Sequence, residues 1–555
     1  MLLNGSEILL ECLLEQGVDS VFGFPGGAVL NIYDALYKYR GKINHYLTSH
    51  EQGASHAADG YARSTGKVGV CLATSGPGAT NLVTGIATAY MDSVPIVAIT
   101  GNVSLNLLGK DSFQEVDITG ITMPITKHNF IVKDIAELAD TVRRAFYIAK
   151  EGRPGPVLID IPKDITATMY EYTKAEPSAI SRSVKTISKK NTAKAAELIK
   201  ESKRPFIYAG GGVITSGASE GLLKLVEKID SPIGLSTMGL GGLPTDNPYY
   251  TGMIGMHGSK ASNVGITECD LLIAVGARFS DRVVSNVSKF APNSKVVHID
   301  IDAAEIDKNV ITYTSIVGDV KEVLERLIDS VGQLKHTEWV QYINSVKAKY
   351  PVSYKDDGSL KPQYILQKIS ELTNNEAIVV TDVGQHQMWA CQFINHQHPR
   401  SFLTSGGLGT MGFGFGAAIG AKVGNPEKTV FNITGDGCFR MNNIELATAV
   451  EYSLPVITVI MNNHSLGMVR QWQNFFYDRR FSHTDLNRTT DFIALAKAYK
   501  AEAFNIKNKE EAEPILKQAL ACKRPCIINC EISNEENVLP MVPSGAGIDE
   551  MLLEG

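Results

Sequence analysis

Two apolar runs that end at polar turns constrain the fold of this chain more than any other feature. The run before Gly435 and the run at 456–461 are short and apolar without alternation, as in strands buried on both faces of a parallel sheet. The first ends in GDG at 435–437 and the second in NN at 462–463. Both strands are therefore predicted to end at one edge of a sheet, where open α/β sheets bind ligands.

The chemistry of these two turns suits a magnesium ion that carries a diphosphate. Mg²⁺ takes one or two protein oxygens together with phosphate oxygens, and Asp436 and Asn463 offer such oxygens. Taken singly, each turn is more often structural. Together, at this spacing, they resemble the metal motif of thiamin diphosphate enzymes. The resemblance implies that Asp436 and Asn463 ligate the metal and that the Ser465 carbonyl adds a third oxygen.

Length and charge indicate a globular enzyme of several domains. A chain of 555 residues is too long for one core and predicts three or four domains. The net charge of -6 gives no reason to expect nucleic acid or an anionic membrane as a partner. Residues 1–17 have leucines at helical spacing among acidic residues, and no apolar run approaches the length of a membrane span. We therefore expect an N-terminal amphipathic helix and a cytoplasmic protein.

The eight cysteines do not predict a metal site or a disulfide framework. The cluster CKRPCIINC at 522–530 fits no zinc spacing, and most of it lies in a predicted strand. We expect buried, reduced thiols.

Alternating short apolar strands and helical stretches predict doubly wound parallel sheets, and the resemblance of the metal motif to thiamin diphosphate enzymes implies the thiamin diphosphate-binding fold. The predicted units lie at 1–170, 190–345 and 360–535, with a C-terminal tail at 536–555. The family resemblance implies that they are, in this order, a pyrimidine-binding domain, a central FAD-binding domain and a diphosphate- and Mg-binding domain.

The segments between and after these units are expected to be irregular. A polar stretch at about 175–191 is predicted to be a linker, and the tail is predicted to be mobile or a lid. The first and third units share a strand, glycine turn and helix at 74–81 and 434–442. This repeat is weak, because glycine turns follow strands in many α/β proteins.

A second carboxylate is expected at the other end of the cofactor. Thiamin diphosphate acts as an electron sink, and a carboxylate beside its aminopyrimidine ring promotes loss of the C2 proton. Glu51 is the candidate, because it follows the run NHYLT and begins a helical stretch. A glutamate there is more often present for the helix dipole, so the metal motif is what favours the catalytic role.

Motifs along the whole chain make the resemblance close. They are HEQGASHAADGYAR at 50–63, TSGPGATN at 74–81, RPGPVLIDIPKDI at 153–165, VGQHQMWA at 383–390, SGGLGTMGFG at 405–414, GDGCF at 435–439 and NNHSLGMVRQW at 462–472. From Gly23 to Met468 the chain resembles the catalytic subunit of acetohydroxyacid synthase, also called acetolactate synthase.

This resemblance implies the roles of the cofactor residues. Glu51 would relay a proton to the pyrimidine ring, and Gly409 and Met411 would contact that ring. Met411 would lie beneath the cofactor and bend it, although such a methionine is otherwise a core residue. The residues implied for the diphosphate are Gln385, His386, Gly437 and Cys438.

The second unit resembles the flavin-binding pattern of the FAD-containing enzyme, which catabolic acetolactate synthases lack. Its motifs are GGG at 210–212, GMHG at 255–258, GARFSDR at 276–282 and HIDID at 298–302. Ser280 departs from the family's usual aspartate, which bears on flavin affinity rather than on flavin binding. Glycine turns let a diphosphate approach the backbone, and an arginine can pair with its charge. The residues implied for FAD are Arg153, Gly211, Gly212, Met256, His257, Arg278, Asp300 and Asp319.

Five residues are implied in substrate binding. Phe113 and Gln114 would lie in the active-site channel, with Lys163 near its mouth. Arg282 would receive a ketoacid carboxylate, because guanidinium is a planar bidentate donor, and a surface ion pair is the equal alternative. Trp472 would line the acceptor pocket and favour a larger 2-ketoacid, although an isolated tryptophan more often serves packing.

The activity implied is carboligation of 2-ketoacids. A hydroxyethyl carbanion formed from pyruvate would attack pyruvate or 2-ketobutyrate, giving 2-acetolactate or 2-aceto-2-hydroxybutyrate, the first common step of branched-chain amino acid biosynthesis. FAD would be structural, because the reaction has no net redox step. A homodimer or homotetramer with the active site between chains, and a regulatory small subunit, are also implied.

Four alternatives remain open at this point. Pyruvate oxidase and pyruvate decarboxylase belong to the same superfamily. Glyoxylate carboligase is a weaker match, because that family lacks the glutamate found here as Glu51. A non-catalytic cofactor-binding sensor would not need Glu51 at all.

Overall fold

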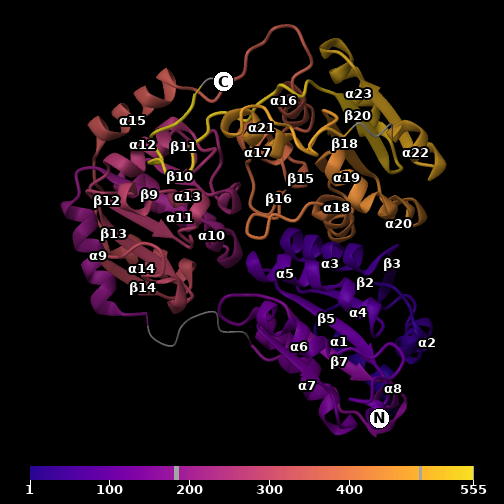
Figure 1. Cartoon of the computed structure of the whole chain (residues 1–555). Helices are drawn as coiled ribbons and strands as arrows, with labels where there is room; N and C mark the ends of the chain where they lie inside the picture. Colours follow the sequence, from indigo (N-terminus) through magenta and orange to yellow (C-terminus); the bar gives the residue numbers. More distant parts are fainter. Residues whose placement is uncertain (180–186, 487–489, 554–555) are drawn as a thin grey trace.

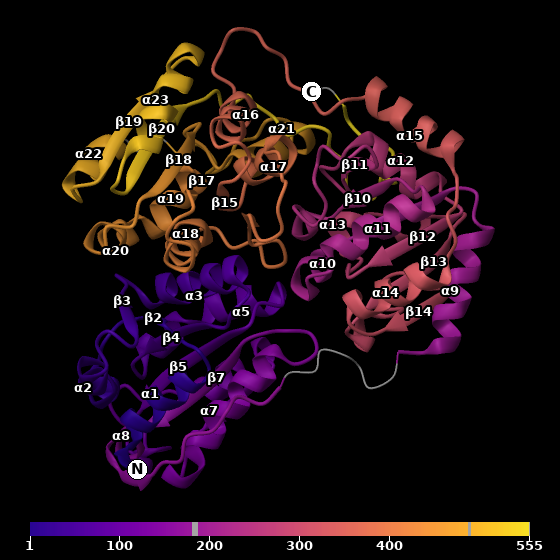
Figure 2. The ribbon, with the colours of Figure 1, turned by 180° about the vertical axis from the view of Figure 1, so that it is seen from behind.

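Aliphatic and β-branched runs form three parallel sheets, each covered by helices on both faces. The computed structural model describes residues 1–179, 187–486 and 490–553. The three sheets belong to three bodies that lie side by side, with the first and third bodies in contact through α3, α5 and α18 (Figure 1). The view from behind shows the same arrangement (Figure 2). The predicted fold class is therefore confirmed.

The first body holds a parallel sheet with the strand order β3-β2-β4-β5-β7-β6. Its strands are β2 (Ser20–Gly23), β3 (Asn44–Leu47), β4 (Gly69–Ala73), β5 (Ile96–Asn102), β6 (His128–Ile131) and β7 (Val157–Pro162), beside a small antiparallel pair of β1 (Leu2–Asn4) and β8 (Met169–Glu171). Its helices are α1 (Gly5–Glu15), α2 (Leu30–Lys38), α3 (Glu51–Thr65), α4 (Pro77–Asn81), α5 (Val83–Met91), α6 (Ile118–Thr122), α7 (Ile135–Lys150) and α8 (Lys163–Ala167). The expected N-terminal helix is α1, which begins with a capping box of Asn4 and Glu7.

The second body holds a parallel sheet with the order β11-β10-β9-β12-β13-β14. Its strands are β9 (Pro205–Ala209), β10 (Ile233–Leu235), β11 (Tyr250–Met253), β12 (Leu271–Val275), β13 (Lys295–Asp300) and β14 (Thr314–Val317). Its helices are α9 (Lys189–Glu201), α10 (Gly211–Ser216), α11 (Ser219–Ile229), α12 (Lys260–Glu268), α13 (Asp281–Val284), α14 (Val320–Ser330) and α15 (Thr337–Lys349). The linker prediction is wrong at its end, because Ser188 caps α9 inside the predicted range, while residues 180–186 lie outside the described chain.

The third body holds a parallel sheet with the order β16-β15-β17-β18-β20-β19. Its strands are β15 (Ile378–Thr381), β16 (Phe402–Leu403), β17 (Val430–Gly435), β18 (Val456–Asn462), β19 (Glu502–Ile506) and β20 (Cys526–Glu531). Its helices are α16 (Pro362–Leu372), α17 (Gln385–Phe393), α18 (Phe413–Gly424), α19 (Asp436–Asn442), α20 (Leu446–Glu451), α21 (Gly467–Phe476), α22 (Phe492–Ala498) and α23 (Lys509–Ala521). The two apolar runs of the sequence are β17 and β18, paired in parallel with Gly435 opposite Met461.

The first and third sheets have the same strand order. In both, the second strand pairs on one side of the first strand, the third pairs on its other side, and the last two are exchanged. The weak glycine-turn repeat at 74–81 and 434–442 therefore belongs to two bodies of one topology.

Helices α3 and α18 join these two bodies through glycine and alanine. A Cβ on Gly60 would overlap the Ala417 carbonyl, and one on Gly420 would overlap the Ala57 carbonyl. Such contacts let the two backbones approach closely without an intervening side chain. The start of α3 is thereby fixed relative to the start of α18.

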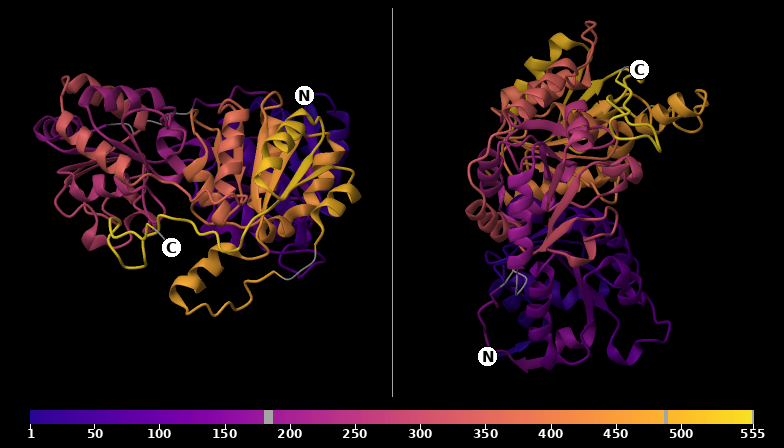
Figure 3. Two further views of the ribbon diagram at one scale, coloured as in Figure 1. Left: turned by 90° about the horizontal axis from the view of Figure 1, so that it is seen from above. Right: turned by 90° about the vertical axis from the view of Figure 1, so that its left-hand side faces the viewer.

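The C-terminal segment, defined as residues 536–553, packs across the second and third bodies. Its buried side chains include Val538, Met541, Val542 and Ile548. Val542 N donates to the Met256 carbonyl at 2.9 Å, and Asn263 Nδ2 donates to the Ile548 carbonyl at 2.7 Å. Two turned views place the C terminus beside the second body (Figure 3). The tail is therefore packed in this structure rather than free, and the alternative of a lid stays a prediction.

The cysteines and helices agree with two further expectations. All eight cysteines are free thiols, and each is buried except Cys522, which is partly exposed. Across the described chain, no helix combines the length and the apolar character that crossing a bilayer requires.

Candidate active site

The candidate site lies at the carboxyl edge of the third sheet. Strand β15 lies between β16 and β17, so the chain leaves β15 toward β16 on one side and later returns to β17 on the other side. This reversal of strand order is where open α/β sheets bind ligands. The turns after the two strands meet here, because the His386 ring lies against Gly435 so closely that a Cβ would crowd it.

Asp436 is a buried carboxylate that has no hydrogen-bond partner. Asp436 is the first residue of α19 and is 1% exposed. Neither Oδ1 nor Oδ2 forms a hydrogen bond. Burial raises the pKa of Asp436 to about 6, against the opposing effects of Arg440 and His464. A buried and unpaired carboxylate is costly, and a bound cation would remove that cost. The residue therefore fits a hard metal ion.

Asn463 and Ser465 follow the neighbouring strand, β18. Asn463 Nδ2 donates to Gln385 Oε1 at 3.2 Å, and its Oδ1 accepts from Ser465 N at 3.2 Å. The buried Ser465 hydroxyl has no partner. In the described part of the chain, no group of three or more His, Cys, Asp or Glu side chains could hold a metal. A metal at Asp436 would therefore depend on amide, carbonyl and phosphate oxygens, as Mg²⁺ does.

The residues implied for the diphosphate offer backbone donors more than side chains. Both Gln385 Nε2 hydrogens are engaged, by the Gln471 amide at 2.9 Å and by the Glu536 carbonyl at 2.8 Å. The Cys438 thiol donates to the Val383 carbonyl at 3.1 Å, and burial raises its pKa. Backbone N–H groups in the first turn of a helix lack partners within the helix. Gln385 opens α17 in this way.

His386 and Gly437 lie on the same edge. Burial lowers the pKa of His386 to about 3, so its imidazole is neutral, and its buried Nε2 has no partner. The Met411 side chain reaches to within contact distance of a Cβ placed on Gly437. Met411 thus lies next to the turn at 435–437, and its implied contact with the cofactor ring stays a prediction.

The loop that carries Gly409 and Met411 is held by two aspartates that sequence reasoning missed. Asp92 accepts from Gly407 N at 2.7 Å and from Gly406 N at 3.1 Å. Asp382 Oδ1 accepts from Gly412 N at 2.7 Å. Asp382 could have been found, because it directly follows the apolar run AIVVT at 377–381. Asp92, in the first body, carried no local signal.

A buried arginine holds Asp92 in place. The Arg63 guanidinium pairs with Asp92 at 2.9 Å and with Asp59, and it donates to the Thr404 carbonyl at 2.8 Å. Gly409 itself has a φ of 72°, a left-handed conformation that favours glycine. The loop conformation therefore depends on both the first and the third body.

Glu51 begins α3 and is 7% exposed. Its Oε2 accepts from Asn81 Nδ2 at 2.9 Å. Glu445 of the third body holds the turn before it, accepting from Ser49 N at 3.0 Å and His50 N at 2.9 Å, and burial raises the pKa of Glu445. The carboxylate of Glu51 is thus buried and held by a neutral amide.

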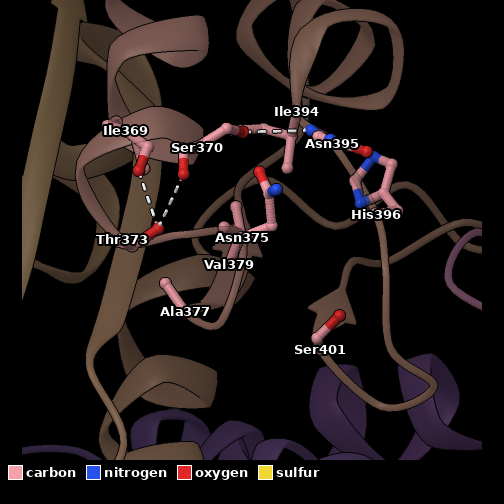
Figure 4. Close-up of a pocket in the computed structure, with 10 residues that line it drawn as sticks. All are labelled: Ile369, Ser370, Thr373, Asn375, Ala377, Val379, Ile394, Asn395, His396 and Ser401. Atoms are coloured by element: carbon pink, nitrogen blue, oxygen red, sulfur yellow. Dashed lines mark hydrogen bonds between the residues drawn. The ribbon is translucent and has the colours of Figure 1, made fainter. Parts of the chain in front are cut away.

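Glu51 and the metal turns belong to the edges of two different sheets. Within the described residues, no hydrogen bond or ion pair joins Glu51 to Asp436, Asn463 or Met411. A pocket lined by Ser370 lies at the amino ends of β15 and β16, on the opposite edge of the third sheet (Figure 4). That pocket is therefore separate from the candidate site.

The residues implied for FAD gather at the carboxyl edge of the second sheet. The strand order reverses between β9 and β12, and a Cβ on Gly210 or Gly212 would overlap Gly276. The glycines therefore allow two turns to touch at a position where ligands bind. Around this edge lie Gly211 and Gly212 after β9, Met256 and His257 after β11, Arg278 after β12, Asp300 at the end of β13 and Asp319 after β14.

Several of these residues already have protein partners. Arg153 pairs with Glu305 at 2.8 Å and Asp302 at 3.2 Å. Asp319 caps α14. Burial raises the pKa of Asp300 to about 6, and one of its oxygens accepts from Asp302 N at 2.9 Å.

His257 and Ser280 lie at different depths of this edge. His257 Nδ1 is 3.1 Å from the Pro540 carbonyl of the C-terminal segment, which therefore covers this turn. Ser280 is exposed before α13 and makes no capping hydrogen bond through its side chain.

The residues implied for substrate are dispersed over the single chain. Phe113 is 88% exposed, and Gln114 has a φ of 58° beside Gly76. Lys163 is exposed at the start of α8. Arg282 is 68% exposed, and its Nε is 3.7 Å from Oδ2 of Asp281. Trp472 lies on α21 after the metal turn, with its ring 5.2 Å from that of Phe476.

Three family models match the chain in the order of its three bodies. The thiamine pyrophosphate enzyme N-terminal TPP binding domain matches residues 3–121, and the central domain of these enzymes matches 192–327. The C-terminal TPP binding domain matches 382–530, which contains every metal and diphosphate candidate named above. Thiamine pyrophosphate is another name for thiamin diphosphate, so binding of this cofactor is established at the level of the domains.

Relatives match nearly the whole chain. A "Probable acetolactate synthase large subunit" of Methanocaldococcus jannaschii is 48% identical over 99% of this chain and 95% of its own length. An "Acetolactate synthase" of Mycobacterium leprae is 46% identical over 99% and 90%, and an "Acetolactate synthase large subunit" of Haemophilus influenzae is 45% identical over 99% and 98%. The chain therefore belongs to the acetolactate synthase large-subunit family of thiamine pyrophosphate enzymes.

Proposed function

We propose that the chain is an acetolactate synthase, which decarboxylates pyruvate and joins the two-carbon unit to pyruvate or 2-ketobutyrate. The products are 2-acetolactate and 2-aceto-2-hydroxybutyrate. The observation that carries the proposal is the buried, unpaired Asp436 at the strand edge of a chain that matches acetolactate synthases along almost its whole length.

The proposed metal ligands are Asp436, Asn463 and the Ser465 carbonyl, with Mg²⁺ as the ion. Bound thiamin diphosphate supplies the electron sink for decarboxylation. The chain supplies hydrogen-bond donors for the diphosphate of the cofactor and a side chain that packs against its rings. The diphosphate contacts are assigned to Gln385, His386, Gly437 and Cys438, and the ring contacts to Gly409 and Met411.

Glu51 is proposed to exchange a proton with the aminopyrimidine ring. Burial at the start of α3 and a single neutral hydrogen bond from Asn81 leave its carboxylate free to accept a proton. The glutamate and the metal turns belong to separate bodies, which supports a homodimer or homotetramer with the site at the interface. The name "large subunit" among the relatives supports a regulatory small subunit.

FAD is proposed to lie across the carboxyl edge of the second sheet, held by the eight residues named for it. Its role is structural, since the proposed reaction transfers no net electrons. Among the substrate residues, Phe113 is so exposed that a second chain is expected to complete its surroundings. Arg282 and Lys163 supply positive charge for ketoacid carboxylates, and Trp472 sets the size of the acceptor.

Product analysis tests this function. Pyruvate alone should yield 2-acetolactate, and an equal mixture with 2-ketobutyrate should yield both products. Replacing Trp472 with leucine should lower the share of 2-aceto-2-hydroxybutyrate, because a smaller side chain loses contact with the longer acceptor. Acetyl phosphate or acetaldehyde as the main product would instead identify a pyruvate oxidase or a pyruvate decarboxylase.

Asp92→Asn is predicted to weaken thiamin diphosphate binding by about ten-fold. The change removes the charge that pairs with buried Arg63 and weakens the acceptor for two loop N–H groups. Cofactor affinity measured by calorimetry checks this. Asp34→Asn is the control, because Asp34 forms only an exposed pair with Lys38. Equal affinities in both variants would exclude a role for Asp92 in holding the loop.

A further inference from the structure

Gln471 is a buried amide between the candidate metal turn and the C-terminal segment. It lies on α21 and is 2% exposed. Its Oε1 accepts from Gln385 Nε2 at 2.9 Å and from Val538 N at 2.8 Å. Its Nε2 donates to the Val538 carbonyl at 3.1 Å and contacts Met541 Sδ at 3.6 Å. All four hydrogen-bonding positions of the amide are therefore filled.

The Val538 backbone fixes which way this amide points. A peptide N–H can only donate and a carbonyl can only accept, so the two bonds to Val538 set the Gln471 oxygen and nitrogen. A flipped Gln471 would place oxygen against oxygen and nitrogen against N–H. Since both groups are buried, leaving them unmatched would cost on the order of 1–3 kcal/mol each.

The polarity then passes through Gln385 to Asn463. With the Gln471 oxygen facing it, Gln385 must present its Nε2, which also donates to the Glu536 carbonyl at 2.8 Å. Gln385 Oε1 therefore points away and accepts from Asn463 Nδ2 at 3.2 Å. Asn463 Oδ1 is thereby turned away from Gln385, where it accepts from Ser465 N at 3.2 Å and keeps a second lone pair for another group. A cation needs this oxygen and is repelled by the amide nitrogen.

We propose that Gln471 is a positioning residue that orients Asn463 through Gln385, so that the asparagine oxygen faces the metal. This inference rests on the proposed function for the identity of the ion and its diphosphate. The Gln471 amide would thus link the turn at Asn463, through Gln385, to the C-terminal segment at Val538. Gln471 would not contact the cation itself, because Gln385 and Asn463 lie between them.

The test uses the full-length chain with Gln471→Met, which keeps the length of the side chain and removes all its strong hydrogen bonds. The Mg²⁺ concentration for half-maximal binding of thiamin diphosphate, measured by calorimetry, should rise about ten-fold. Gln473→Met is the matched control. Its amide lies on the same helix and bonds to Ser482 and Thr484 instead, so its Mg²⁺ requirement should stay unchanged.

A double-mutant cycle separates positioning from packing. If Gln471 acts through Gln385, then adding Gln471→Met to Gln385→Met should weaken binding little further. Hydrogen exchange at Val538 should rise in Gln471→Met and not in Gln473→Met. Fully additive losses, or a lower melting temperature with an unchanged Mg²⁺ requirement, would show that Gln471 only fills space.

These measurements are independent of the reaction catalysed. If the wild-type chain bound Mg²⁺ with thiamin diphosphate but formed acetaldehyde, the proposed function would fail and the role of Gln471 would stand. If Gln471→Met kept the wild-type Mg²⁺ requirement while acetolactate was formed, only the role of Gln471 would fail.

Discussion

Replacing Glu51 with glutamine is expected to lower the rate of acetolactate formation by about a hundred-fold or more. A positioned general acid or base contributes roughly 10²–10⁴-fold, and glutamine cannot accept the proton. The amide can still accept the hydrogen bond from Asn81, which is 2.9 Å long in the native chain. Helix α3 should therefore form normally, and Mg²⁺ with thiamin diphosphate should still bind.

Two measurements check this expectation. Initial rates of acetolactate formation give the loss of activity, and calorimetry gives the cofactor affinity. Glu7→Gln is the control, since Glu7 also lies in the first turn of a helix in the same body and serves a capping box. A Glu51→Gln chain with near-native rates would refute the proton relay and favour a non-catalytic cofactor-binding sensor.

Asp436→Asn is expected to abolish the stabilisation of the protein by Mg²⁺ and thiamin diphosphate. The carboxylate is buried, and neither oxygen has a hydrogen-bond partner, so its ligand-free state carries a desolvated charge that Arg440 and His464 offset only in part. A ligand at 100 times its dissociation constant stabilises a folded protein by about 2.7 kcal/mol. With the charge removed, metal affinity should fall by about a hundred-fold or more, and this gain should disappear.

Thermal unfolding with and without both ligands measures this effect. The variant without ligands should be at least as stable as the wild type, because asparagine removes a desolvated charge. Asp491→Asn serves as the control: Asp491 caps α22 in the same body, and asparagine caps helices about equally well. An Asp436→Asn chain that is still stabilised by both ligands would place the metal elsewhere.

Sequence reasoning found the strands that end at the site, because each carries a continuous apolar run. β17 and β18 are buried along almost their whole length. The two edge strands of the third sheet were missed, because they lack a continuous apolar run. β16 has two residues, and most of β19 is only partly buried, beginning at the exposed Glu502, so neither needs a continuous apolar pattern.

Charged helices can also conceal their structure. Helix α9 begins within the stretch predicted to be a linker. Lysines are frequent in its first turns, and this local charge is what favoured the linker prediction. Its buried stripe of Ala195, Ala196, Leu198 and Ile199 follows only further along the helix. The linker prediction followed the local charge, whereas packing against the second sheet decides the structure.

The candidate site was predictable where the motif residues lie at strand ends, and unpredictable where partners come from other bodies. Asp436 and Asn463 follow adjacent strands, so their proximity follows from topology. Asp92 and Glu445 act across the contact between the first and third bodies. No local pattern encodes such contacts, since they depend on which helices meet in three dimensions.

The glycines between α3 and α18 set a limit on attempts to engineer heat resistance into this protein. Exchanging a helical glycine for alanine usually stabilises a helix by roughly 0.5–1 kcal/mol, so automated redesign would select Gly60 and Gly420. A methyl group at either position would meet the backbone of the opposing helix. It would force α3 and α18 apart, and these helices begin at Glu51 and directly after the loop that carries Gly409 and Met411. A more rigid helix would thus come with a misaligned catalytic centre.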